Sequence, residues 1–178
     1  TDGLFASDDE AANYVVDQSP INTIIAGNGG LRAGDLKYVD LDGDNVISTG
    51  ANTVDKPGDR RIIGNSQPRF QYGLTLGFNW NGFDFSAFFQ GVGRQNWYPS
   101  SDARYFWGLY ARPFTSWIQR DFLGNCWSEE NPDAYFPRPR AYIAFDSKGK
   151  RSLAAVNDRY LQNLAYCRLK NLTVGYTS

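Results

Sequence analysis

The sequence contains no histidine, no methionine and only two cysteines among its 178 residues. Without histidine the chain has no Ser-His-Asp or Cys-His catalytic arrangement and no histidine-ligated zinc site. Acidic and basic residues are nearly balanced, 19 against 18, so the chain lacks the basic excess that nucleic-acid binding requires. We therefore expect none of these enzyme classes, and no nucleic acid as a partner.

Long apolar runs are missing as well. No run approaches the roughly 18 residues of a membrane-spanning helix, and the start T-D-G-L-F-A-S-D-D-E does not resemble a signal peptide. The absent initiator methionine and a C-terminus that stops inside a strand pattern favour an internal piece of a longer protein over a complete soluble chain. Cys126 and Cys167 leave open both one disulfide and two free thiols, because spacing alone cannot pair them.

Aromatic residues are abundant, and the most regular pattern runs from Pro68 to Gly93. From Phe70 to Trp80 every even position is large and apolar, while the odd positions are polar or glycine. Asn81-Gly82 suits a tight type I′ turn, and the alternation resumes at Phe83, with Phe88 as an exception. A period of two predicts a β-hairpin with one apolar and one polar face.

Two features of this hairpin favour a membrane. Its polar face is small or uncharged, and each arm of about eleven residues, at ~3.3 Å per residue and a tilt near ~45°, spans about 25 Å, the height of the apolar band of an outer-membrane barrel. A soluble carbohydrate-binding β-sandwich is the alternative, although its solvent-facing strand positions should be charged. In the membrane interpretation the side chains that point to lipid include Tyr72, Leu74, Leu76, Phe85 and Phe89.

The hairpin divides the chain into four regions: a loop region with an acidic turn (1–67), the hairpin (68–93), a long aromatic-rich loop (94–158) and a further strand (159–178). A capping box, Ser7 with Glu10, predicts a short helix reaching about Tyr14. Helical spacing within 114–124 predicts a second. In the last strand the phase of the alternation changes, which predicts a bulge near Lys170-Asn171.

The acidic turn D-L-D-G-D-N-V-I-S carries the strongest metal pattern in the sequence. Asp40, Asp42 and Asp44 occupy positions 1, 3 and 5 of an EF-hand-like loop, and Val46 offers its carbonyl at position 7. Three carboxylates within five residues repel one another unless a cation or solvent lies between them. The sequence therefore predicts a calcium site at these four residues.

Two departures weaken the match to a calcium loop. Asn45 replaces the glycine of position 6, and Ala51 stands where the bidentate glutamate belongs, although Asp55 or Asp59 is available to close the shell. The alternative is an acidic turn whose side chains only hydrogen-bond their own backbone.

Six ordered blocks of the sequence carry a resemblance that covers nearly the whole chain. They are T-D-G-L-F (1–5), G-D-L-K-Y-V-D-L-D-G-D-N-V-I (34–47), I-I-G-N-S-Q-P-R-F (62–70), G-F-D-F-S-A-F-F-Q-G (82–91), W-S-E-E-N-P-D-A-Y-F-P-R (127–138) and Y-L-Q-N-L-A-Y-C-R-L-K-N-L-T-V-G-Y-T (160–177). In this order they resemble the C-terminal part of SusC/RagA-type TonB-dependent outer-membrane receptors. The chain departs from the usual pattern at Asn45, where glycine is common.

The resemblance implies an all-β fold, namely part of a transmembrane antiparallel β-barrel whose long extracellular loops carry short helices. It implies an importer of glycans or peptides in the outer membrane, with a SusD-like surface lipoprotein as lid, TonB acting through an N-terminal part that this chain lacks, and no catalysis. The resemblance leaves open whether the complex forms a homodimer. Aromatic rings stack on sugars and also pack loops together, and the expected substrate or lid contacts are Trp97, Tyr98, Trp107 and Trp117.

Overall fold

A computed structural model describes residues 1–21, 30–100, 102–110, 118–139, 153 and 155–177. The described chain divides into two compact units. We call Ile63–Tyr98 with Leu161–Ser178 the sheet unit, and Thr1–Ile62 with Pro99–Tyr160 the loop unit. Each unit combines two segments that are distant in the sequence.

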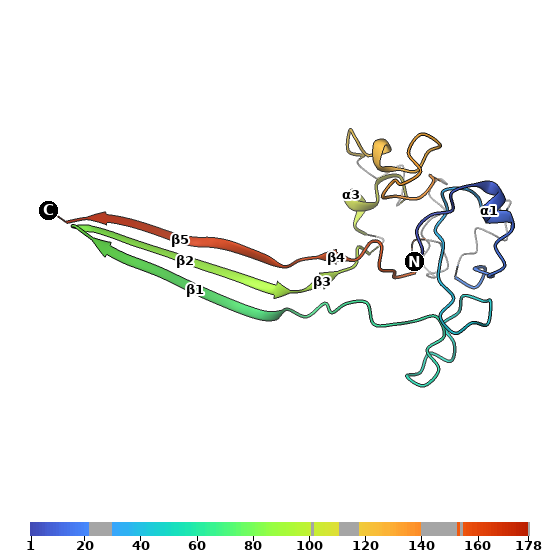
Figure 1. Cartoon of the computed structure of the whole chain (residues 1–178), viewed down its shortest axis with the longest axis horizontal. Coiled ribbons are helices and arrows are strands. Elements are labelled where there is room, and N and C mark those ends of the chain that lie inside the picture. The colour runs from blue at the N-terminus through green and yellow to red at the C-terminus, as the bar shows by residue number, and fades with distance from the viewer. Residues whose placement is uncertain (22–29, 101, 111–117, 140–152, 154, 178) are drawn as a thin grey trace. The chain divides into compact units, whose positions relative to one another are not determined.

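The sheet unit is built on three long antiparallel strands, β1 (Arg69–Trp80), β2 (Phe83–Arg94) and β5 (Tyr166–Tyr176). They lie side by side in the order β1-β2-β5 (Figure 1). Among the described residues the strands form an open sheet and not a closed barrel. Strands predominate over short helices, which is consistent with the predicted all-β class.

The predicted hairpin is confirmed. β1 and β2 pair from Arg69 opposite Arg94 to Trp80 opposite Phe83, without a register shift. The turn residues Asn81 and Gly82 both have positive φ, 47° and 83°, as a type I′ turn requires. These two residues reverse the chain with the right-handed twist that the flanking strands need.

The predicted bulge is also confirmed. β2 pairs with β5 in register except at one point, where Asn171 lies opposite Phe88 and Leu169 lies opposite Phe89. Lys170 is therefore the extra residue of the bulge. This one-residue insertion returns Leu169 to the same face as Leu172, which alternation alone would have placed on opposite faces.

Residues that pair across strands project from the same face, so the sheet has two faces of different chemistry. The apolar face carries Tyr72, Leu74, Leu76, Phe78 and Trp80 of β1, Phe83, Phe85, Ala87 and Phe89 of β2, and Leu169, Leu172, Val174 and Tyr176 of β5. The polar face carries Arg69, Gln71, Gly73, Thr75, Gly77 and Asn79 of β1, Asp84, Ser86, Phe88, Gln90, Val92 and Arg94 of β2, and Tyr166, Arg168, Asn171, Thr173 and Gly175 of β5.

The five side chains predicted to point to lipid all lie on the apolar face. Leu74 and Leu76 expose 50% and 49% of their surface, so this face is not covered by the described chain. Beyond the long strands, β3 (Asn96–Trp97) pairs with β4 (Gln162–Asn163) in a small second sheet of the same unit.

The loop unit has an aromatic core of its own. Phe136 is its centre: its ring stacks on Tyr110 and Tyr160 at centroid distances of 5.7 and 5.8 Å and contacts Phe122 at 4.9 Å. Trp107 packs edge-on against Tyr160 at 5.1 Å. These rings come from segments up to about 50 residues apart, so their burial holds the long loop together.

Short helices interrupt the loop unit: α1 (Asp8–Ala12), α3 (Arg104–Trp107) and the 3₁₀ turns η1 (Gly108–Tyr110) and η2 (Leu123–Asn125). The predicted cap of α1 is confirmed, because Glu10 donates its N–H to Ser7 Oγ at 3.1 Å and Glu10 Oε2 accepts the Ala6 N–H at 2.7 Å. Over residues 118–122 the expected helix is not found, and 114–117 lie outside the described residues. No helix in the described part is long and apolar enough to cross a membrane.

Candidate functional site

The acidic turn of the loop unit is the candidate ligand site. Its backbone turns at Gly43 and Asn45, where φ is 80° and 61°, as convergence of the carboxylates requires. Asp40 accepts two backbone N–H groups across this turn, Gly43 N–H on Oδ1 at 2.7 Å and Asn45 N–H on Oδ2 at 2.8 Å. Ile47 is buried at the end of the turn and anchors it to the unit.

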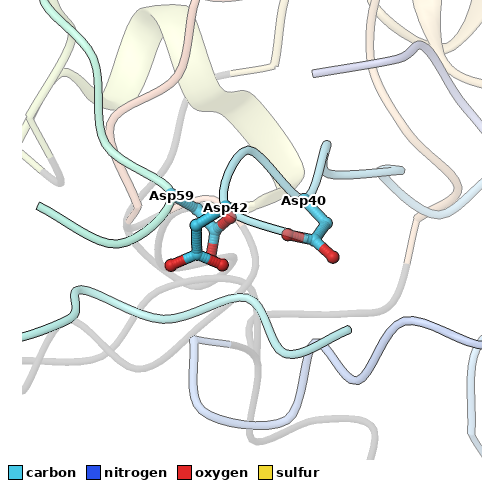
Figure 2. Close-up of side chains that lie close together, drawn as sticks. All are labelled: Asp40, Asp42 and Asp59. Carbon is cyan, nitrogen blue, oxygen red and sulfur yellow. The ribbon is translucent and has the colours of Figure 1, made fainter. Parts of the chain in front are cut away.

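Asp59 joins the turn from a segment eleven or more residues away. Its two carboxylate oxygens accept the N–H groups of Leu41 at 2.6 Å and Ser48 at 2.7 Å, so it ties both ends of the turn together. One carboxylate oxygen each from Asp40, Asp42 and Asp59 lies within 4.8 Å of the others, and Figure 2 shows the three side chains together. Oxygen-only ligands of this kind suit a hard divalent cation such as calcium.

The two other predicted ligands lie elsewhere in the turn. Asp44 Oδ1 accepts the Val46 N–H at 2.7 Å, and Asp44 is not among the three grouped carboxylates. Val46 forms an isolated parallel bridge with Asp17. The sequence offers Asp59 only as a closing ligand, with Asp55 as the alternative, because nothing in it shows which of the two folds back onto the turn.

The electrostatics differ between the two neighbouring carboxylates. Hydrogen bonds from Asn45 and Gly43 lower the pKa of Asp40. The pKa of Asp42 is raised, first by desolvation and further by the negative charges of Asp44, Asp59 and Asp40. A cation would relieve this repulsion, whereas the backbone hydrogen bonds alone leave it in place.

The predicted aromatic contacts fall into different environments. Trp97 on β3 is 43% exposed, and Tyr98 beside it is half-buried. Trp107 is fully buried in the loop unit and its indole N–H donates to the carbonyls of Pro99 and Ser100 at 3.2 and 3.0 Å. Trp117 lies outside the described residues. Of the predicted contact residues that the structure describes, Trp97 and Tyr98 are the two that keep some solvent exposure.

Comparison with known proteins gives one informative similarity. The chain is 31% identical over 140 residues to the TonB-dependent receptor P3 of Formosa agariphila, and the match covers 78% of this chain and 11% of that protein. It supports the TonB-dependent receptor family. The named relative is a receptor and not an enzyme, and the chain spans about a tenth of its length. No family model matches the chain.

Proposed function

We propose that the chain is a segment of a TonB-dependent outer-membrane importer, in which the sheet unit forms part of the wall of a transmembrane β-barrel. The observation that carries this proposal is the two-faced sheet: large apolar side chains are exposed on one face, and mostly polar side chains and glycines lie on the other. A soluble sandwich buries its apolar face, whereas a barrel wall turns it to lipid. The receptor-like relative supports the same assignment.

The substrate and partners belong to the same proposal. The importer takes up glycans or peptides, a SusD-like surface lipoprotein covers it, and TonB provides the coupling through a region outside this chain. The loop unit then faces the extracellular side, because long loops lie outside and the short Asn81-Gly82 turn lies on the periplasmic side. Exposed Trp97 and half-buried Tyr98 are the residues proposed for substrate or lid contact.

Calcium has a structural role in this proposal. A cation held by Asp40, Asp42 and Asp59 would stiffen the acidic turn within the loop unit, and Asp44 and the Val46 carbonyl remain the further proposed ligands. With alanine at position 51 instead of a bidentate glutamate, we expect affinity at the weak extracellular end, about 10⁻⁴ to 10⁻³ M.

The test uses the full-length receptor that contains this chain, expressed in its own host or in a Gram-negative host. We expect it in the outer-membrane fraction, with a folded form that migrates differently from the heat-denatured form in detergent gels. We expect a SusD-like gene beside the receptor gene, and deleting it, or inactivating TonB, should abolish uptake of the solute that supports growth. A receptor found in the soluble periplasmic fraction would refute the proposal and favour the carbohydrate-binding sandwich.

A further inference from the structure

Charge is distributed unevenly on the polar face of the sheet. The single carboxylate of the three long strands is Asp84, which lies opposite Asn79 in the row next to the Asn81-Gly82 turn. Three arginines lie toward the other end of the strands: Arg69, Arg94 and Arg168. That end of the polar face is therefore cationic.

Arg69 and Arg94 are directly opposite each other on β1 and β2. Residues in such a pair project from the same face with neighbouring Cβ atoms, and like charges at such positions repel. Both side chains are exposed, and within the described ranges neither takes part in a hydrogen bond or ion pair. The pair lacks an anionic partner among the residues that the structure describes.

Arg168 adds a third guanidinium to this end of the face. It lies opposite Gln90, and its guanidinium carbon stands 4.6 Å from the centroid of the Tyr166 ring. Tyr166 pairs with Val92, which lies between Gln90 and Arg94 along the same face of β2. Because the Arg168 guanidinium lies over the Tyr166 ring, it is displaced from its own position toward the other two arginines. A guanidinium placed over a ring keeps N–H groups available for an oxyanion.

We propose that Arg69, Arg94 and Arg168 bind the oxyanion groups of an anionic oligosaccharide on the polar face of the sheet. Gly73, Gln90 and Arg168 lie opposite one another across the three strands and form one row, and Arg69 and Arg94 form another. Arg69 and Gly73 are four residues apart on β1, so the two rows that contain arginines are roughly 13 Å from each other along the strand. A ligand that carries charges on more than one sugar can span this distance and contact both rows. Carboxylate and sulfate groups both match the arginine fork.

The neighbouring side chains favour a saccharide over an acidic peptide. Gln71, Gln90, Thr75 and Asn171 lie near the arginines on this face, beside Val92 and Phe88, and offer amides and a hydroxyl to sugar hydroxyl groups. A peptide is usually captured at a free strand edge by backbone hydrogen bonds, but β2 is paired on both sides, and closure of the proposed barrel pairs the outer edges of β1 and β5 as well. This inference rests on the proposed function, which turns the polar face to the interior of the barrel.

The experiment measures binding to the full-length receptor in detergent by calorimetry. The probes are oligogalacturonate of four to six units, sulfated dextran oligosaccharide and neutral dextran oligosaccharide of equal length. We expect the wild type to bind at least one anionic probe, more weakly at higher NaCl, and not the neutral one. The double variant Arg69→Gln/Arg94→Gln should lower that affinity at least tenfold, and the galacturonate and sulfate arms show which oxyanion is preferred.

Two further variants control for charge and folding. Arg60→Gln/Arg120→Gln removes two exposed arginines from the loop unit and should leave the affinity unchanged. Arg69→Lys/Arg94→Lys keeps the charge but removes the fork, so it should fold normally and bind with an affinity between those of the wild type and the glutamine variant.

Three outcomes overturn the inference. The first is an inserted wild-type receptor that binds no anionic probe, and the second is equal affinity in the wild type and the Arg69→Gln/Arg94→Gln variant. The third is that oligoglutamate, used as a fourth probe, binds more tightly than either anionic oligosaccharide. Each of these leaves the importer assignment intact, whereas absence of the wild type from the outer-membrane fraction refutes the proposed function itself.

Discussion

The hydroxyl of Tyr72 donates a hydrogen bond of 3.2 Å to the carbonyl oxygen of Tyr166, across the middle strand of the sheet. Tyr72 lies on β1 and Tyr166 on β5, and Gly91 of β2 lies between them. A Cβ atom at Gly91 would stand 2.3 Å from both the Tyr72 hydroxyl and the Tyr166 carbonyl oxygen. The contact that links the outer strands therefore requires glycine at this position.

Replacing Gly91 by alanine tests this relationship. We expect Gly91→Ala to destabilise the folded receptor by about 1 to 3 kcal/mol, because the methyl group must displace a backbone oxygen as well as the tyrosine. Urea unfolding of the receptor in lipid vesicles measures the change. Gly77→Ala is the control: its Cβ would meet its nearest neighbour at an ordinary 3.5 Å, so the expected change is within about 0.5 kcal/mol. Equal effects of the two variants would contradict the steric argument.

The two faces of the sheet predict opposite tolerance to charge. Leu76 lies on the apolar face opposite Ala87, and Thr75 lies on the polar face opposite Phe88. Leu76→Arg should cost about 2 to 4 kcal/mol of folding free energy if the residue lies near the bilayer midplane, and Thr75→Arg should cost less. The yield of heat-modifiable receptor in the outer membrane reports the difference. Equal losses would favour a soluble sandwich.

Removing one of the grouped carboxylates tests the calcium proposal. We expect Asp42→Asn to weaken calcium binding at least tenfold, because this carboxylate is already disfavoured by its acidic neighbours and gains most from a cation. Calcium titration by calorimetry in chelator-treated buffer measures it. Asp133→Asn, an exposed change elsewhere in the loop unit, should have no effect. If the wild type binds no calcium at millimolar concentrations, the stretch is an acidic turn without a calcium site.

The two pKa shifts predict an order of events on acidification. Asp42 has a raised pKa and is protonated first as the pH falls. Calcium affinity should therefore begin to decrease at a pH above the ordinary aspartate pKa of ~3.9. Asp40 has a lowered pKa: its stabilising contribution is fully present above that ordinary value and is lost only as the pH falls through the lower folded value. Hydrogen exchange of the Gly43 and Asn45 amides should therefore stay slow after calcium binding is lost. Simultaneous loss would contradict this order.

Substitutions of two tryptophans distinguish a packing role from direct contact with the solute or lid. Trp107→Ala removes a fully buried ring and should destabilise the loop unit by about 3 to 5 kcal/mol. Trp97→Ala removes a ring that is 43% exposed and should leave stability nearly unchanged while weakening solute or lid binding. Limited proteolysis of the loop unit and a binding titration measure the two effects. A binding loss in Trp97→Ala that only follows lost stability would assign that ring to packing.

The local elements of this protein were determined by short stretches of sequence. Alternation from Phe70 to Trp80, the Asn81-Gly82 turn and the Ser7 cap each depend on residues within a few positions, where side-chain periodicity and backbone preference decide the outcome. Even the bulge at Lys170 was predictable, because the alternation on one strand changes phase there.

The site residues depended on contacts that no local pattern contains. Asp59 was one of two candidate closing ligands until the chain folded back onto Leu41 and Ser48, and Trp107 was one of four equivalent rings until the aromatic core buried it. The opposition of Arg69 and Arg94, and the stacking of Arg168 on Tyr166, follow from strand register and from the pairing of β2 with β5. Periodicity determined which side chains share a face of one strand. Only tertiary structure decided which strands and turns became neighbours, because that choice depends on the burial and hydrogen bonding of segments far apart in the chain.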